Sequence, residues 1–256
     1  MTDQIIVQQE GGIMTIRINR PEKKNALTLA MYSAMVTALQ AAEADPAVRV
    51  IVFAGSPTCF TSGNDIMDFM QSPPTDASSP VFQFLQAIVE AKKPLIAAPA
   101  GLAIGIGTTM LLHCDLVYAG QETRFQLPFV NLALVPEAGS SYLLPRMMGH
   151  VRAAELLLLG GPFDTAKASE YGFVNAVLPN DQVLDAAMAA AADLAAKPPT
   201  AVRLSKELLK RYSGPIVAET IRVEAKLFAE RLVSPEAGEA FAAFMERRQP
   251  DFSKFS

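Results

Sequence analysis

Alternating apolar and polar residues open the chain and predict a β-hairpin. Apolar runs at residues 5–7 and 13–18 lie on either side of a Glu-Gly-Gly turn. Thr28 can then cap a helix, because apolar residues recur at helical spacing until Asp45 and the proline after it end the pattern. Residues 48–54 form an apolar run that only Arg49 interrupts, which predicts a buried strand.

The same order of strand, glycine-bearing turn and helix recurs further along the chain. The apolar residues 94–98 predict a strand, residues 101–107 a glycine-bearing turn, residues 108–113 a helix and residues 116–119 another strand. Such alternation favours an α/β fold, in which ligands bind at the carboxyl ends of strands. Residues 70–80 carry three prolines among Ser, Thr and Asp, so we expect a surface loop there.

The C-terminal part of the chain is predicted to be mostly helical. Its apolar faces are wide, and such faces need a partner surface, either the chain's own core or another subunit. We therefore expect a core over residues 1–196 and a helical oligomerisation region over residues 197–256. A strand is expected at residues 174–178 and helices at residues 151–159, 165–171, 182–196 and 200–248, with breaks near Gly214 and Ser234.

The composition fits a protein with a large core. Half of the 256 residues are hydrophobic, and the two cysteines, Cys59 and Cys114, are too few for a disulfide framework and lack metal-ligand spacing. A net charge of -4 offers no broad basic surface, so we expect no nucleic-acid partner. The opening residues do not resemble a secretory signal and no apolar stretch is long enough for a bilayer. We expect a cytoplasmic protein with no membrane association.

Two glycine-bearing segments are candidates for binding an anion. In residues 59–66, Gly63 allows a tight turn, so that amide hydrogens around Ser62 can point into a cleft. In residues 99–108, spaced glycines precede a helix whose first amides can donate to an oxyanion. A helix cap in the first segment and tight helix–strand packing in the second are the alternative interpretations.

A third segment, residues 127–141, carries one candidate acid–base group. Glu137 lies in a run that is otherwise almost free of charge, which can raise its pKa and make it a general base. Compensation of a helix dipole is an equally ordinary role for a glutamate in this position. The two histidines, His113 and His150, are isolated in the sequence, and packing is the expected role for each.

The order and spacing of the three segments resemble the crotonase superfamily, the enoyl-CoA hydratase and isomerase enzymes, over residues 12–252. Further matching segments are residues 19–27 (NRPEKKNAL), 171–174 (YGFV) and 240–250 (AFAAFMERRQP). The resemblance implies an α/β crotonase (ClpP-like) fold of repeated ββα units with a helical C-terminal region. It also implies a homotrimer or a dimer of trimers.

The resemblance implies a role for each candidate site residue. The backbone amides of Ser62 and Ile106 would form an oxyanion hole for a thioester carbonyl, and Glu137 would be the catalytic residue. Coenzyme A would be part of the acyl-CoA substrate, and neither a metal nor a prosthetic group is expected. The CoA contacts are expected from Lys24, Ala26, Asp65, Ile66, Phe244 and Arg247.

Two departures from the family pattern favour isomerisation over hydration. Hydratases of this family use two glutamates to activate water, and the matching positions here are Thr109 and Phe129. Neither side chain can act as an acid or base at neutral pH. The resemblance is greatest to peroxisomal-type isomerases that convert 3-enoyl-CoA to 2-enoyl-CoA in fatty acid metabolism. The alternatives are a hydratase, another lyase or a hydrolase of this fold, and an acyl-CoA-binding module without turnover.

Overall fold

A sheet of six strands forms the centre of the computed structural model, which describes residues 4–74 and 78–255. The first pair is the predicted antiparallel hairpin, and each of the other neighbours pairs in parallel. In their order across the sheet, the strands are β1 (Ile5–Glu10), β2 (Ile13–Ile18), β3 (Val50–Ala54), β4 (Leu95–Ala98), β6 (Leu116–Gly120) and β9 (Ala176–Leu178).

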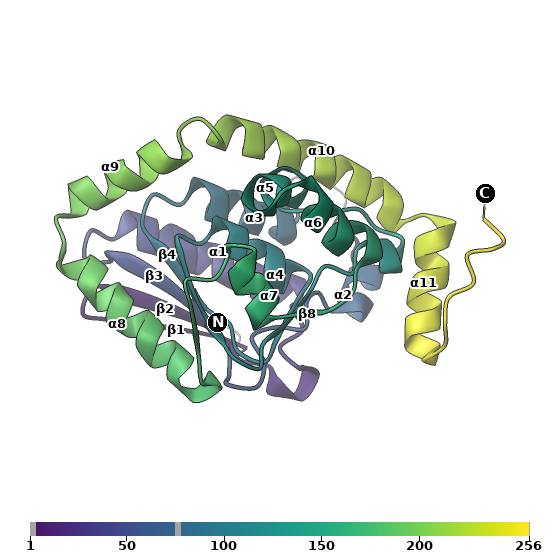
Figure 1. Cartoon of the computed structure of the whole chain (residues 1–256), viewed down its shortest axis with the longest axis horizontal. Coiled ribbons are helices and arrows are strands. Elements are labelled where there is room, and N and C mark those ends of the chain that lie inside the picture. The colour runs from purple at the N-terminus through teal and green to yellow at the C-terminus, as the bar shows by residue number, and fades with distance from the viewer. Residues whose placement is uncertain (1–3, 75–77, 256) are drawn as a thin grey trace.

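Helices make up most of the remaining regular structure (Figure 1). They are α1 (Leu29–Ala44), α2 (Ile66–Gln71), α3 (Pro80–Glu90), α4 (Ile106–Thr109), α5 (Ser140–Met148), α6 (His150–Ala154), α7 (Thr165–Glu170), α8 (Val183–Ala196), α9 (Pro199–Lys210), α10 (Gly214–Leu232) and α11 (Pro235–Glu246). Short 3-10 turns lie at Pro21–Lys23, Met110–His113, Val130–Leu132 and Asn180–Gln182, and a π-helical turn at Glu155–Leu159.

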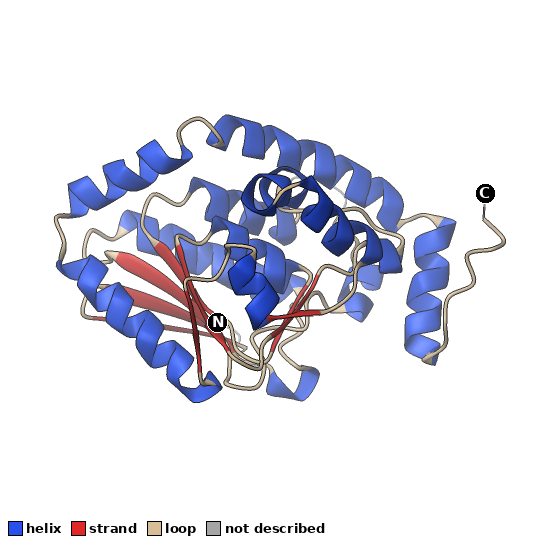
Figure 2. Cartoon of the chain, viewed as in Figure 1, coloured by secondary structure: helices blue, strands red, loops and turns tan. Residues whose placement is uncertain are grey.

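Helices cover both faces of the central sheet (Figure 2). Val50 and Val52 of β3 pack in one apolar cluster with residues of α8, whereas Ile51 and Phe53 pack on the opposite side with residues of α1 and α3. Because alternate side chains enter two different cores, β3 must be apolar throughout. This two-sided burial explains why the sequence shows a continuous apolar run there.

The first predicted helix is confirmed. The Thr28 hydroxyl accepts a hydrogen bond from the Met31 amide at 3.3 Å, which caps the start of α1. The helix ends at Ala44, directly before the Asp45-Pro46 pair. The predicted breaks in the C-terminal region are also confirmed, because α10 begins at Gly214 and α11 is capped by Ser234.

A second, three-stranded sheet was not predicted. It consists of β5 (Leu102–Ile104), β7 (Arg124–Gln126) and β8 (Phe163–Asp164), in that order. The segment 101–107, predicted to be a turn, therefore contains a strand. Helices α3 and α5 were also missed, and the expected loop at 70–80 is corrected because α2 continues to Gln71. Residues 75–77 of that expected loop lie outside the described residues.

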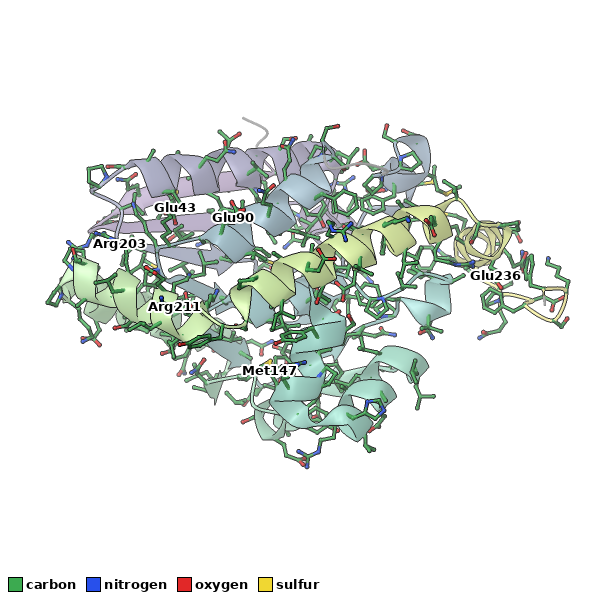
Figure 3. The ribbon with its side chains drawn as sticks, turned by 90° about the horizontal axis from the view of Figure 1, so that it is seen from above. Glu43, Glu90, Met147, Arg203, Arg211 and Glu236 are labelled. Carbon is green, nitrogen blue, oxygen red and sulfur yellow. The ribbon has the colours of Figure 1, made fainter. Side chains whose placement is uncertain are left out.

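Helix α10 crosses the molecule over α3 and α5, as the view from above shows (Figure 3). It is therefore part of the structure around the core and not a separate appendage. Among the helices that the structure describes, none combines the length and apolar character needed to cross a membrane.

Candidate active site

Two chain segments that bear the predicted anion-binding turns run side by side. Thr61 pairs in parallel with Ala103 of β5, through hydrogen bonds from the Thr61 amide to Leu102 at 2.9 Å and from the Ile104 amide to Thr61 at 3.0 Å. Asn64 and Ile106 lie three residues further along the two segments, and both line one cavity.

Glycine is required between these two segments. Gly63 has a φ of 92°, and a Cβ there would lie 3.0 Å from the carbonyl oxygen of Ile104. A side chain at this position would therefore meet both an unfavourable backbone conformation and a neighbouring strand.

The structure corrects the predicted first oxyanion donor. The Ser62 amide already donates to the Lys24 carbonyl at 3.0 Å, so the prediction that it points into the cleft is wrong. The residues on either side of Asn64 both bond to Leu27. The Leu27 amide donates to the Gly63 carbonyl, and the Asp65 amide donates to the Leu27 carbonyl, each at 2.8 Å. The Asn64 N–H therefore faces away from Leu27.

The amides of Asn64 and Ile106 are available as donors. Within the described part of the chain, neither N–H has a hydrogen-bond acceptor. Ile106 is the first residue of α4, so its amide has no partner within the helix. Both residues line the same narrow cavity as Glu137. The two amides and the carboxylate are thus gathered at one place.

Glu137 is a buried carboxyl group with a shifted pKa. Its residue is 8% exposed, and the Thr109 hydroxyl of α4 donates a hydrogen bond to Oε1. Burial raises the pKa of Glu137 to about 8, and the charge of Glu224 acts in the same direction, while the Thr109 hydrogen bond opposes both. A carboxyl group with a pKa near neutrality can both take up and release a proton at physiological pH.

The turn that carries Glu137 has an unusual backbone. Ala138 has a φ of 58° and Gly139 a φ of 72°, so two consecutive residues are left-handed before α5 begins. His113 Nε2 lies 2.6 Å from the Ala138 carbonyl and donates to it. Burial lowers the pKa of His113 to about 4, so its ring is neutral and supports the turn. This contact fits the packing role expected for His113.

The cavity beside Glu137 is narrow and mostly apolar, with a volume of about 10 Å³. Tyr32 and Asn64 add polar groups to its wall, and the tyrosine hydroxyl donates to Asn64 Oδ1 at 2.5 Å. Burial, followed by the charge of Glu137, raises the pKa of Tyr32 well above its usual value. Among the described residues that line the cavity, Glu137 is the only carboxylate. The other lining residues are Phe69, Pro74, Val81, Phe82, Leu85 and Phe228.

Of the lining residues, sequence reasoning found only Ile106 and Glu137. Asn64 lies only two residues from Ser62 in the same short motif, so the motif was the available signal. Tyr32 belongs to the buried side of α1, where it is not distinguishable from core residues in the sequence. Phe228 comes from α10, and nothing in the sequence relates it to a site built from residues 32–137.

The predicted CoA-binding residues fall into two groups. Ala26 and Asp65 flank the Leu27–Asn64 bridge, Ile66 follows Asp65, and the Lys24 carbonyl accepts from the Ser62 amide. Their backbones therefore lie together next to the proposed donors. Phe244 is 59% exposed on α11, and in the described structure no hydrogen bond or ion pair connects it or Arg247 with the first group.

The Asp65 side chain is held within the protein. Its carboxylate forms an ion pair with Arg20 at 2.7 Å and accepts hydrogen bonds from the Met67 and Asp68 amides at the start of α2. Burial acts to raise the pKa of Asp65, but the Arg20 hydrogen bond, together with those amides, lowers the pKa overall. Any contact with CoA would therefore involve the backbone at Asp65.

The two positions that would carry the hydratase glutamates are not acidic in the folded site. Thr109 is fully buried and donates to Glu137, and Phe129 is 6% exposed among apolar residues. Within the described residues, no group of three or more His, Cys, Asp or Glu side chains is placed to hold a metal ion. The site therefore offers one acid–base group and two backbone donors.

A wider cavity of about 380 Å³ lies elsewhere, between α3 and α9. Glu90, Arg203 and Arg211 are on its wall (Figure 3), and none of its lining residues is shared with the Glu137 cavity. Leu204 of α9 is on its wall, whereas the exposed Leu208 and Leu209 of the same helix are not.

The fold and the buried carboxylate beside two free amides define a crotonase-type enzyme. The chain belongs to the enoyl-CoA hydratase/isomerase family, whose model matches residues 8–254. It is similar to OdaA of Pseudomonas aeruginosa, with 51% identity, a TM-score of 0.92 and coverage of 96% of this chain and 100% of that one. This match confirms the predicted fold.

Curated relatives include both isomerases and hydratases. Enoyl-CoA delta isomerase 2 of Rattus norvegicus is 34% identical over 95% of this chain. The match covers 64% of the rat protein's length. The 2,3-dehydroadipyl-CoA hydratase of Escherichia coli strain K12 is 31% identical, with coverage of 97% of this chain and 98% of that protein. The names of the relatives therefore define the family without deciding between the two reactions.

Proposed function

We propose that the protein is an isomerase that converts 3-enoyl-CoA to 2-enoyl-CoA in fatty acid metabolism. The observation that supports this most strongly is that Glu137 is the one carboxylate among the described residues of the cavity. Shifting a double bond requires one group that removes a proton at one carbon and returns it at another. A single buried carboxylate is sufficient for that task.

Each component of the site has a role in the proposed reaction. Glu137 takes a proton from C2 of the 3-enoyl thioester, and negative charge develops on the thioester oxygen. The amides of Asn64 and Ile106 donate to that oxygen and stabilise the dienolate. Glu137 then returns the proton at C4. Because loss of one such donor typically costs about 2.7 to 4 kcal/mol, the pair supplies a large part of the acceleration.

Coenzyme A enters as part of the substrate, and the mechanism uses no prosthetic group or metal. The proposed contacts with CoA come from Lys24, Ala26, the backbone at Asp65 and Ile66, and from Phe244 and Arg247 of α11 or of a neighbouring subunit. The proposed location is the cytoplasm. A non-catalytic acyl-CoA-binding module would share these contacts but would give no turnover.

Hydration of 2-enoyl-CoA is the main alternative, because several relatives carry hydratase names. We expect hydration to be at least about 100-fold slower than isomerisation, since Thr109 and Phe129 stand at the positions of both water-activating glutamates, and one acid–base group contributes about 10² to 10⁴ in rate. The test offers 3-enoyl-CoA and 2-enoyl-CoA esters of several chain lengths and identifies each product. Hydration as fast as isomerisation would place the protein among the hydratases.

We also expect the protein to assemble, as a homotrimer or a dimer of trimers. Large apolar side chains on α9 and in the following turn are exposed in the single chain, including Leu209 at 84% and Tyr212 at 85%. Covering such a surface stabilises an oligomer. Sedimentation at micromolar concentration is the appropriate measurement. Detection of only a species near 27.4 kDa would contradict this prediction.

A further inference from the structure

Helix α10 presents one face to the turn that carries Glu137. Val217, Ile221, Glu224 and Phe228 are spaced by four, three and four residues, so they lie on one side of the helix. Val217 and Ile221 approach Gly139, since a Cβ there would lie 3.2 Å and 3.4 Å from their side chains. Phe228 lines the Glu137 cavity. The helix is thus part of the site's wall.

Glu224 is the charged residue of this face. It is only 6% exposed, and Oε2 accepts a hydrogen bond from the Gly139 amide at 2.6 Å. Oε1 accepts from the Ser141 amide at 3.0 Å and from the Ser141 hydroxyl at 2.5 Å. Among the described residues no cation forms an ion pair with Glu224. The carboxylate is therefore held by donors of the Glu137 turn and of the first turn of α5.

The turn needs such support because its backbone is strained. Ala138 is left-handed with a Cβ, a conformation that costs energy unless the surroundings impose it. His113 holds the Ala138 carbonyl from one side, and Glu224 holds the next amide from the other. The Glu137 side chain is attached directly before this constrained pair, so its direction depends on both contacts.

We propose that Glu224 is a positioning residue for Glu137: it fixes the turn that aims the catalytic carboxyl group and keeps a second negative charge beside it. This inference rests on the proposed function of Glu137. The groups that face Glu137 are the Thr109 hydroxyl, the neutral Tyr32 hydroxyl and Glu224. Of these, Glu224 is the ionisable neighbour whose negative charge raises the pKa of Glu137. Burial raises the pKa of Glu224 itself, while the hydrogen bonds from Ser141 and Gly139 favour its charged form. A helix cap alone would stabilise α5 without affecting the titration of Glu137.

Glu224→Gln separates these roles. The amide keeps one acceptor but places an N–H group against a backbone donor, and it removes the charge. We expect kcat to fall by about 10- to 100-fold with KM nearly unchanged, since a small displacement of a catalytic group has effects of this size. The pH profile of kcat/KM should move to lower pH. Glu219→Gln is the matched control, because Glu219 is exposed on the same helix and pairs with Arg222.

Ser141→Ala provides a second, milder test. It removes one hydrogen bond to Glu224 but leaves the charge, so we expect kcat to fall by about 2- to 10-fold without a shift of the pH profile. If Glu224→Gln does not fold, this variant decides. An unchanged kcat in Ser141→Ala, or a loss in Glu224→Gln that only follows the folded fraction with no shift of the profile, would overturn the inference.

A measurement without substrate keeps this inference distinct from the proposed function. The side-chain carboxyl groups can be labelled with carbon-13, and the Glu137 signal can be assigned by its absence in Glu137→Gln. We expect its NMR titration midpoint to be lower in Glu224→Gln than in the wild type and unchanged in Glu219→Gln. Absence of isomerase activity in the wild type would contradict the proposed reaction alone, whereas an unshifted midpoint would contradict the role of Glu224.

Discussion

Replacement of Glu137 by glutamine is expected to reduce isomerisation by about 10²- to 10⁴-fold, the range that one general acid–base group contributes. Glutamine keeps the size of the side chain and can still accept from the Thr109 hydroxyl, but it cannot carry a proton from C2 to C4. The loss should therefore appear in kcat, while binding of an acyl-CoA remains close to wild type. Product formation and hydrogen exchange at C2 in deuterated water measure the two halves of the reaction.

Glu219→Gln again serves as the control, because Glu219 is exposed, pairs with Arg222 and does not line the Glu137 cavity. If Glu137 only compensated a helix dipole, its replacement would cost about 0.3 to 1 kcal/mol of stability and leave turnover intact. A Glu137→Gln variant that exchanges and isomerises at nearly the wild-type rate would rule out the assignment. Asp65 and Glu122 would then be the next candidates for the base.

The central sheet was predictable because its strands are determined by local apolar patterns. β3 contributes alternate residues to two cores, so every position had to be apolar. α1 has a threonine cap and a proline after its end, which are both local signals. By contrast, β5, β7 and β8 are two or three residues long. Segments this short are stabilised by their neighbours in the sheet and leave little pattern in the sequence.

The error at Ser62 shows a different limit. The motif around Gly63 located the anion-binding turn, but the direction of each amide depends on backbone angles that the motif does not specify. The chain turns at Gly63, which has a positive φ. The Ser62 amide before it bonds to Lys24, whereas Asn64 after it lines the cavity and its amide has no acceptor among the described residues. Glu224 and Phe228 were missed because they approach from α10, which is far away in the sequence.

The rate of isomerisation is expected to rise with pH until about pH 8. Burial raises the pKa of Glu137 to about 8, and a base must be deprotonated to accept the C2 proton. Below that pH the active carboxylate form therefore decreases tenfold per unit, so kcat/KM at pH 6 should be about 100-fold below its plateau. This quantity reports the free enzyme, which is the state that the structure represents.

The measurement is the initial rate between about pH 5.5 and about 9.5. Subtracting the rate of the Glu137→Gln variant removes the contribution of thioester hydrolysis. Sedimentation at each pH shows whether the protein dissociates. A plateau already reached by about pH 5.5 would mean that Glu137 has an ordinary carboxyl pKa in solution. In that case the apolar cavity is more hydrated than its narrow dimensions imply, and burial does not tune the base.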